Sequence, residues 1–383
     1  MNGSLRQRGA SSWELRVYDG THPDTGKMRY ATRTVRGSRR EAEAELAGFA
    51  AQVSQPPRRA LDTTFKELFE QWYANAAPRW AVNTQRQTRS VIDVHLIPRF
   101  GHFAVGQLTT AGIDAFYADL RDRGGRDGRG LSDGTVHRIH GVLRRALTQA
   151  VRWDWVWTNP AEHACPPIAQ RREIFSPPPA AVARLLAATQ ATPGLHTFFR
   201  VAVSTGARRG QVCALRWNDI DLDRNTISFA RALAEGPKGG VQIVPTKNGN
   251  RNRVEVDDAT MDEVRRHRDH VQAQAAAAGV ELLPNAYVFA READGVSPWR
   301  PNWVTKTFIR LRDANGLRGH RLHDLRHFMA TEMLAAGVPI PVVSARLAHN
   351  RVSTTLDVYA HAVPGGDRTA ADGLADLLRR AAS

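Results

Sequence analysis

Two proline-containing stretches divide this chain into three segments, and this division limits the folds that are open to it. The first stretch is Gln55-Pro56-Pro57, and the second runs from Asn159-Pro160 to the prolines at 177–179. Proline lacks a backbone N–H and fixes φ, so such stretches interrupt helices and central strands alike. The chain has 383 residues and no internal repeat, and we therefore expect three domains, at residues 1–57, 61–165 and 174–383.

The first segment predicts a small sheet covered by one helix. Trp13, Leu15 and Val17 alternate with polar residues, which is typical of a strand with one buried face. A turn at 19–27 separates this strand from a second one near 28–35. Ser38 and Glu41 then form the S-x-x-E capping box of an alanine-rich helix. We predict a ββα unit, or ββ(β)α if a third strand is added.

The second segment predicts a helical domain. Its first apolar residues recur at the spacing of one helix face, from Phe65 to Tyr73. A second helix is predicted at 84–96, ending before Pro98, and a third after residues 109–110. A long helix is predicted from about residue 132, and it carries three arginines on its surface: Arg138, Arg144 and Arg145. A solvated helix face and a DNA-facing role explain these arginines equally well.

The third segment mixes helices with short strands, which are predicted near residues 227–229, 241–244, 254–256 and 287–289. The fold class that follows is mostly α with small β-sheets. It consists of the N-terminal sheet-and-helix unit, a helical domain and a mixed α+β domain.

The charge of the chain indicates a polyanionic partner. Lys and Arg number 53 against 38 Asp and Glu, which gives a formal net charge of +15. Basic side chains that neutralise DNA phosphates release counterions, and this favours nucleic-acid binding over the alternative of a solvated basic surface. We expect a cytoplasmic, nucleoid-associated protein without a membrane partner. The chain has two isolated cysteines, no apolar signal region and no uncharged apolar run of spanning length.

The residues suited to chemistry lie in the third segment. They are basic or phenolic and stand in short motifs: Arg208 in TGAR, Lys247 in PTKN, His323 and Arg326 in HDLRH, His349 in LAH, and Tyr359 in DVYAH. No G-x-x-x-x-G-K-[ST] loop and no G-x-S-x-G motif occurs, which argues against nucleotide hydrolysis and serine-hydrolase chemistry.

The HDLRH motif also permits a zinc interpretation, because His323 and His327 have the spacing of the H-E-x-x-H zinc site. Two features argue against it. Asp324 replaces the glutamate that must reach the zinc-bound water, and Arg326 places positive charge beside the metal position. We therefore expect no metal and no cofactor.

Together, these residues fit the cleavage of a phosphodiester without a metal ion. Arginines grip phosphate through forked donors, and positive charge aimed at a developing dianion is usually the largest catalytic term. A tyrosine forms a covalent intermediate, while histidine and lysine exchange protons with the attacking and departing oxygens. Because the intermediate keeps the energy of the ester, rejoining requires no ATP.

At these motifs the sequence resembles the tyrosine recombinase (phage integrase) family. The segment TGARRGQVCALRWNDIDL is similar to the family's first arginine motif, and HDLRHFMATEMLAAGVPIPVVSARLAHNRVSTTLDVYAH is similar to its H-x-x-R … H … Y motif. The resemblance implies a site-specific recombinase, an integrase of a phage or mobile element. It also implies an arm-type DNA-binding domain, a helical (SAM-like) core-binding domain and a catalytic tyrosine-recombinase domain, in that order.

The resemblance assigns the main catalytic roles by position. Arg208 and Arg326 would clamp the scissile phosphate, and Tyr359 would attack it to leave a 3′-phosphotyrosyl link. Lys247 would be the general acid for the departing 5′ oxygen, although Lys238 lies nearby and competes for this role.

The remaining assignments concern two histidines and two departures from the family pattern. By resemblance, His323 assists proton transfer from the nucleophile, and His349 hydrogen-bonds the phosphate. Gln211 stands where the family usually has glutamate, and Ala348 stands where it usually has glycine. Neither departure replaces a catalytic residue, so we expect activity.

The expected partner is double-stranded DNA at attachment sites. In the family, a C-terminal tail such as residues 367–383 links protomers, which implies a homotetramer on two DNA duplexes. DNA-bending accessory proteins and a directionality factor are possible further partners. In the first segment Arg16, Arg29 and Arg33 are expected to line the open face of the sheet and to enter a major groove. The alternative is a stabilising cap with incidental charge.

Three other functions compete with this prediction. A catalytically silent DNA-binding protein would not need the complete set of basic residues and the tyrosine. A type IB topoisomerase shares the chemistry but not the three-part layout. A chromosome-dimer-resolving recombinase of the same family usually lacks the first segment.

Overall fold

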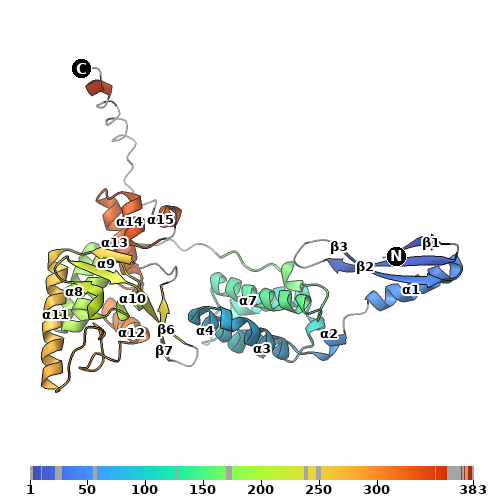
Figure 1. The fold of residues 1–383 in the computed structure, drawn as a ribbon, viewed down its shortest axis with the longest axis horizontal. Helices are drawn as coiled ribbons and strands as arrows, with labels where there is room; N and C mark the ends of the chain where they lie inside the picture. Colours follow the sequence, from blue (N-terminus) through green and yellow to red (C-terminus); the bar gives the residue numbers. More distant parts are fainter. Residues whose placement is uncertain are drawn as a thin grey trace. The chain divides into compact units, whose positions relative to one another are not determined.

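The computed structural model describes residues 3–9, 11–21, 28–54, 58–125, 127–169, 175–236, 240–246, 252–349, 351–359 and, in the C-terminal tail, 372, 375 and 378–381. The chain forms two compact units, Met1–Arg171 and Arg172–Ser383 (Figure 1). Within the first unit, residues before 55 and after 58 have separate hydrophobic cores. The expected division into three domains stays a prediction.

The N-terminal core lies between a three-stranded antiparallel sheet and one helix. The strands follow the order β1 (Gly3–Gly9), β2 (Ser12–Thr21) and β3 (Met28–Arg36), and α1 (Arg39–Ser54) packs against them. Leu15 and Val17 are fully buried under α1 beside Leu46 and Phe49, as the alternating pattern predicts. Ser38 caps α1, since its backbone N–H donates to Glu41 Oε2 at 2.7 Å.

The helical part of the first unit buries one continuous apolar core. Its α-helices are α2 (Arg58–Asp62), α3 (Phe65–Ala76), α4 (Val82–Val91), α5 (Ile97–Phe100), α6 (Thr110–Arg123) and α7 (Asp133–Arg152). The predicted helix starts near 65, 110 and 132 are confirmed, and Thr64 and Thr109 cap α3 and α6 with their side chains.

The prediction that the second of these helices ends before Pro98 is wrong. After α4 the chain makes a π-helical turn at Ile92–Leu96 and continues directly into α5. Pro98 lies in the first turn of α5, where a backbone N–H is not needed for an intrahelical hydrogen bond. The proline is therefore accommodated by the local change in helix type.

The second unit mixes helices with two small antiparallel sheets. Its helices are α8 (Pro179–Thr189), α9 (Pro193–Thr205), α10 (Arg209–Cys213), α11 (Asp258–Ala277), α12 (Pro301–Arg312), α13 (Asp324–Ala335), α14 (Ile340–Arg346) and α15 (Val352–Tyr359). Its strands are β4 (Ile220–Asp221), β5 (Thr226–Phe229), β6 (Arg231–Glu235), β7 (Val241–Pro245) and β8 (Asn252–Glu255). The sheets have the orders β4-β5-β8 and β6-β7.

Three of the four predicted strands of this unit are confirmed as β5, β7 and β8. The fourth is wrong, because Tyr287 forms only an isolated bridge with Arg216. Residues 286–289 are buried and contribute Val288 and Phe289 to the main core as an irregular segment. β6 was not expected from the sequence, and it extends the path of β5 after a one-residue break.

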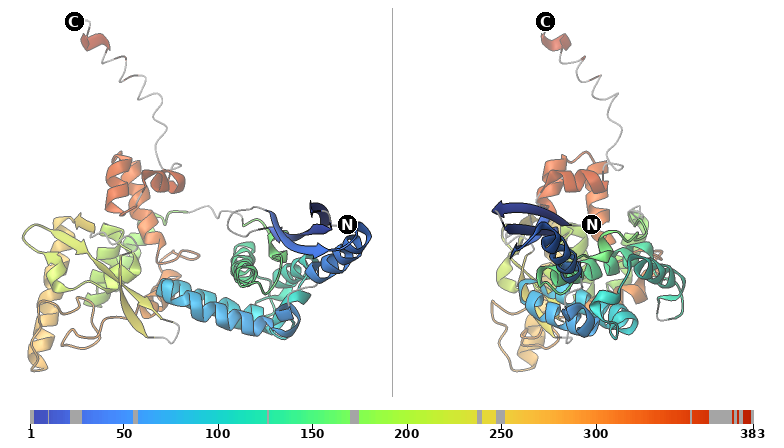
Figure 2. Two further views of the ribbon diagram at one scale, coloured as in Figure 1. Left: turned by 45° about the vertical axis from the view of Figure 1, so that its right-hand side comes forward. Right: turned by 90° about the vertical axis from the view of Figure 1, so that its right-hand side faces the viewer.

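The second unit has two cores, and the smaller one positions the chemistry. The main core is rich in phenylalanine and packs α8, α9 and α11 around the sheet. The smaller core contains Met329 of α13, Val343 of α14, Leu347 at the C-cap of α14 and Tyr359 of α15. These three helices gather at one end of the unit (Figures 1 and 2), and α13 also packs on α9.

In the part of the chain that the structure describes, no helix is both long enough and apolar enough to cross a membrane.

Candidate active site

The first arginine is presented by a tight turn at the end of α9. Gly206 ends the helix with φ +62°, a left-handed conformation that glycine adopts without strain. A Cβ atom at this position would lie 2.1 Å from Met329 Cε, so any side chain here would force the end of Met329 to move. Arg208 follows after Ala207 and is half-buried. Among the described residues, its guanidinium group has no hydrogen-bond or ion-pair partner.

Gln211 supports this turn in place of the glutamate that is usual in the family. Its side-chain Oε1 accepts a hydrogen bond from the backbone N–H of Arg208 at 3.0 Å, and the residue is only 5% exposed. The amide of Gln211 therefore accepts a hydrogen bond at this turn, as a glutamate carboxylate could. Because the amide adds no negative charge, the charge of Arg208 is not neutralised by this neighbour.

Arg326, the second arginine, lies on α13 and hydrogen-bonds to the turn after α9 and to the end of α14. Arg326 Nη1 donates to the carbonyl of Gly206 at 2.7 Å, and Nη2 donates to the carbonyl of Leu347 at 2.6 Å. The side chain is 4% exposed. Burial and the nearby charge of Arg208 lower the pKa of Arg326 to about 10, so it stays protonated at neutral pH. Two guanidinium groups that repel one another in this way create a site for an anion.

His349 is held between Arg326 and α15. Its Nε2 lies 3.0 Å from Arg326 Nη2, and its Nδ1 lies 2.9 Å from Thr355 Oγ1. Arginine can only donate, so Nε2 is the acceptor and Nδ1 carries the hydrogen and donates to Thr355. Burial, followed by the charges of Arg326 and Arg208, lowers the pKa of His349 to about 4. His349 is therefore neutral at physiological pH.

The backbone conformation of Ala348, the residue before His349, explains why the family usually has glycine at this position. Ala348 has φ +49°, the left-handed conformation in which a Cβ atom is strained. Replacing Ala348 with glycine is expected to raise the free energy of unfolding by about 1 kcal/mol. Thermal unfolding of the full chain measures this change. In the matched control, Ala345→Gly within α14, the same substitution should instead destabilise by about 1 kcal/mol. If both variants lose stability, the strain at Ala348 is not relieved by glycine.

Tyr359 lies at the end of α15 with its ring in the smaller core. It is 1% exposed, and its hydroxyl oxygen lies 2.7 Å from His327 Nδ1. Burial raises the pKa of Tyr359 to about 12, although the charge of Arg326 acts in the opposite direction. Arg326 is thus close enough to favour the tyrosinate that an attack on phosphorus requires.

His323 stands beside His327 rather than beside the tyrosine. The two imidazole rings are nearly perpendicular, with centroids 5.0 Å apart. His323 keeps an exposed surface, yet the protein around its ring lowers its pKa to about 4, aided by His327 and Arg326. Among the described residues, His323 makes no hydrogen bond to Tyr359.

We call the residues Arg208, His323, Arg326, His327, His349 and Tyr359 the active-site cluster. From the sequence, His327 stood out only for the spacing of a zinc ligand, and its contact with the nucleophile was not expected. In the described part of the chain no group of three or more His, Cys, Asp or Glu side chains could hold a metal ion. The Nδ1 atom of His327 is instead occupied by Tyr359.

Lys247 and its competitor Lys238 both lie outside the described residues. In the sequence, Lys247 falls between β7 and β8. The first residue of β8 lies near the cluster, because Asn252 Nδ2 donates to the carbonyl of Arg346 at 2.9 Å, shortly before His349 in the chain. The role of Lys247 stays a prediction.

The expected DNA-facing arginines of the N-terminal sheet lie on different faces. Arg16 is exposed on the open face, where its guanidinium group stacks on Tyr30 at 3.7 Å. The expectation for Arg33 is wrong, because it pairs with buried Leu15 and stacks on Phe49 of α1, on the covered face. The side chain of Arg29 lies outside the described residues.

Other basic residues share the open face with Arg16. By the register of the strands, Arg6 and Arg36 point to the same side as Arg16, and neither was expected from the sequence. On α7, all three expected arginines, Arg138, Arg144 and Arg145, are exposed.

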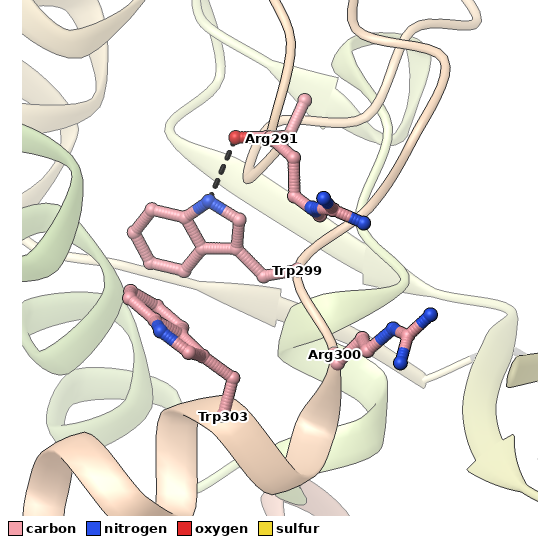
Figure 3. A pocket seen from close by; sticks show the side chains of 5 residues that line it. Arg291, Trp299, Arg300 and Trp303 are labelled. Carbon is pink, nitrogen blue, oxygen red and sulfur yellow. Dashed lines mark hydrogen bonds between the residues drawn. The ribbon is translucent and has the colours of Figure 1, made fainter. Parts of the chain in front are cut away.

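A pocket of about 620 Å³ opens elsewhere on the second unit, at the start of α12. Figure 3 shows Trp299 and Trp303 packed together, with Arg291 and Arg300 beside them. The indole N–H of Trp299 is satisfied, since it donates to the carbonyl of Ala290 at 2.7 Å. No residue of the active-site cluster lines this pocket, and we assign no chemistry to it.

Two family models match the chain. One is described as the phage integrase family and matches residues 179–364, and the other is described as the N-terminal SAM-like domain of phage integrases and matches residues 64–121. Together they cover more than half of the chain. The first match contains every residue of the active-site cluster.

Relatives and solved structures agree with these matches. The ICEBs1 integrase of Bacillus subtilis is 24% identical over 377 residues, which is 98% of this chain and 100% of the relative. The Tn1549 transposon integrase in complex with a circular intermediate DNA has a TM-score of 0.67 at 16% identity, covering 81% of this chain and 99% of that one. A lambda integrase tetramer bound to a Holliday junction has a TM-score of 0.55 at 17% identity, covering 92% and 96%.

Proposed function

The chain belongs to the tyrosine recombinase (phage integrase) family, enzymes that break and rejoin DNA, and on this premise we propose that Tyr359 is the nucleophile of a site-specific recombinase from a phage or mobile element. The observation that carries the proposal is the convergence of the active-site cluster. The turn after α9, the helix α13 and the end of α15 bring Arg208, Arg326 and Tyr359 together across 151 residues, Arg208 to Tyr359.

The geometry supports a different role for each of three residues of the cluster. Arg208, whose guanidinium group is not engaged by described residues, is proposed to bind the non-bridging oxygens of the scissile phosphate. Arg326 is fixed by two carbonyls and presents its remaining N–H groups to the same phosphate. His349 is proposed to hydrogen-bond that phosphate as well. To donate to it, His349 must carry its ring hydrogen on Nε2 in place of the hydrogen bond from Arg326; we propose that DNA binding selects this tautomer, with the Thr355 hydroxyl then donating to Nδ1.

The chemical step then follows from these positions. Tyr359 Oη attacks phosphorus, the bond from phosphorus to the 5′ oxygen breaks, and a 3′-phosphotyrosyl link remains. Lys247 is proposed to donate the proton that the departing 5′ oxygen takes. In the second half of the reaction, a 5′ hydroxyl attacks the phosphotyrosine and releases Tyr359, so neither ATP nor a cofactor is consumed.

The partners are proposed from the same premise. The tetramer of lambda integrase on a Holliday junction supports assembly of this chain as a homotetramer on two DNA duplexes. Accessory DNA-bending proteins and a directionality factor remain proposals, as does association with the nucleoid. The tail proposed to link protomers lies largely outside the described residues.

The N-terminal sheet favours an integrase over a chromosome-dimer-resolving recombinase. The match to the ICEBs1 integrase spans 98% of this chain and therefore includes this unit. We propose that the open face reads arm-type DNA through Arg16, with Arg6 and Arg36 beside it. On α7, Arg138, Arg144 and Arg145 are proposed to contact the core site.

The proposed function is tested by trapping the covalent intermediate. The attachment site is first found by sequencing the junctions made in cells that carry the DNA flanking the gene. On a nicked duplex of that site, the full chain is expected to form an SDS-resistant adduct linked to the 3′ phosphate. Adduct formation should persist in excess EDTA, because the cluster supplies positive charge without a metal ion. Loss of the adduct in EDTA and its return with zinc would contradict the proposal and favour a metal site at HDLRH.

A further inference from the structure

The hydroxyl of Tyr359 has one hydrogen-bond partner among the described residues, and that partner is His327. The distance from Tyr359 Oη to His327 Nδ1 is 2.7 Å. Both side chains are buried, at 1% and 8% exposed respectively. The contact joins α15 to α13, one residue beyond Arg326.

The direction of this hydrogen bond follows from what each atom can do. A phenol O–H must donate, and Nδ1 of His327 is the one described acceptor within reach. If Nδ1 carried a hydrogen, the phenol hydrogen would be left without an acceptor in a buried position, which is costly. Tyr359 therefore donates to Nδ1, and Nε2 of His327 carries the ring hydrogen.

The surroundings keep His327 neutral and able to accept a proton. Burial lowers the pKa of His327, Asp324 opposes this effect, and Arg321 and Arg326 add to it. The titratable and charged groups that face it are Arg321, His323, Asp324 and Arg326 from its own segment, Tyr359 from α15 and His349 from the loop before α15.

We propose that His327 is a catalytic residue of this recombinase, which orients the Tyr359 hydroxyl and accepts its proton as the tyrosine attacks. The inference rests on the proposed function. As the bond from Tyr359 Oη to phosphorus forms, the phenol proton moves to His327 Nδ1, giving an imidazolium. The bond from phosphorus to the 5′ oxygen breaks, and that oxygen takes a proton from the general acid. On rejoining, His327 returns its proton to Tyr359.

This assignment changes the part played by His323. By resemblance His323 assists the proton transfer directly, but its ring contacts His327 and not Tyr359. Its effect on the nucleophile must then pass through His327. The two histidines are consequently distinguishable by experiment, because only one of them touches the reacting oxygen.

The test compares His327→Asn with the matched variant His323→Asn in the full chain. The side-chain oxygen of asparagine takes a position close to that of Nδ1, so it can accept the hydrogen bond but cannot take the proton. On the nicked attachment-site duplex, His327→Asn is expected to slow single-turnover adduct formation about 100-fold. His323→Asn is expected to slow it less.

The dependence of the rate on pH separates a chemical role from a structural one. Neutral His327 is the active form, and burial lowers its pKa, so the wild-type rate should fall only at a pH below the ordinary histidine value of about 6.5. His327→Asn should lose this acidic limb, and His323→Asn should keep it. A His327→Asn variant with the wild-type rate, or with the limb intact, would overturn the proposal.

A measurement without a His327 variant covers the case in which that variant does not fold. In the unliganded full chain with ¹⁵N-labelled histidine, Tyr359→Phe should shift the Nδ1 resonance of one histidine ring, because it removes a hydrogen-bond donor. If no histidine resonance moves, the contact is absent and the proposal fails. Failure of the proposed function is distinct, since wild-type protein would then form no adduct at all.

Discussion

Replacing Tyr359 with phenylalanine is expected to abolish the protein–DNA adduct while leaving the fold and DNA binding in place. The oxygen that is lost is the one that would bond to phosphorus, and no other described side chain of the cluster is a comparable nucleophile. By analogy with other enzymes that lose a nucleophile, cleavage should fall by at least about 10⁴-fold. SDS gels of the nicked attachment-site duplex measure the loss.

The structure indicates why this variant should fold. The ring of Tyr359 packs in the smaller core with Met329 and Leu347, and phenylalanine preserves that packing. Only the hydrogen bond to His327 is removed, at a cost of about 1–2 kcal/mol. Tyr287→Phe is a suitable control, since Tyr287 is also buried in the second unit but lies outside the cluster, and it should keep the adduct. An adduct with Tyr359→Phe would show that another residue attacks the DNA.

Local sequence signals predicted the parts of the fold in which neighbouring residues decide the structure. The capping box at Ser38 marks a helix start because both partners lie within one turn. The alternation of Trp13, Leu15 and Val17 identified β2 because this pattern, too, involves only residues that are close in sequence. The third strand that the prediction left open is β1, and the sequence did not place it because GSLRQRG holds one apolar residue, Leu5, and its pairing with β2 is what makes it a strand.

Other features depend on tertiary contacts that a single sequence does not reveal. Arg33 lies on the covered face because its guanidinium group stacks on Phe49, so a charged residue occupies a position that the alternation pattern would give to an apolar one. Pro98 is tolerated because a π-helical turn precedes α5. Neither effect can be inferred without knowing which elements pack together.

The candidate site, too, could be predicted from the sequence only in part. The order and spacing of the motifs predicted that Arg208, Arg326, His349 and Tyr359 serve one site, and these residues do meet. The hydrogen bond between His327 and Tyr359 joins residues 32 positions apart, and it depends on how α13 and α15 are oriented. A sequence that places two histidines around Arg326 cannot say which of them faces the tyrosine.

The two arginines of the cluster should respond differently to substitution, although both are needed for cleavage. The side chain of Arg208 makes no hydrogen bond to a described residue, whereas Arg326 holds the carbonyls of Gly206 and Leu347. Arg208→Ala should therefore leave the thermal stability close to that of the wild type and slow adduct formation by roughly 10²–10³-fold, the cost of one lost donor group on the developing dianion.

Arg326→Ala should lose both activity and stability. It leaves two carbonyls without a donor in the interior, at about 1–3 kcal/mol each, and removes the partner of His349. Relief of the repulsion between the two guanidinium groups offsets part of this cost, so we expect a net loss of about 3 kcal/mol and a melting temperature lower by roughly 6–12 °C. Differential scanning calorimetry of the full chain and single-turnover cleavage, measured on the same preparations, test both outcomes. If Arg208→Ala loses as much stability as Arg326→Ala, Arg208 has a structural partner, and the separation of a substrate-binding arginine from a scaffold arginine is wrong. If the two variants differ in stability but both lose cleavage, Arg326 both holds the site together and binds the phosphate, whereas Arg208 only binds the phosphate.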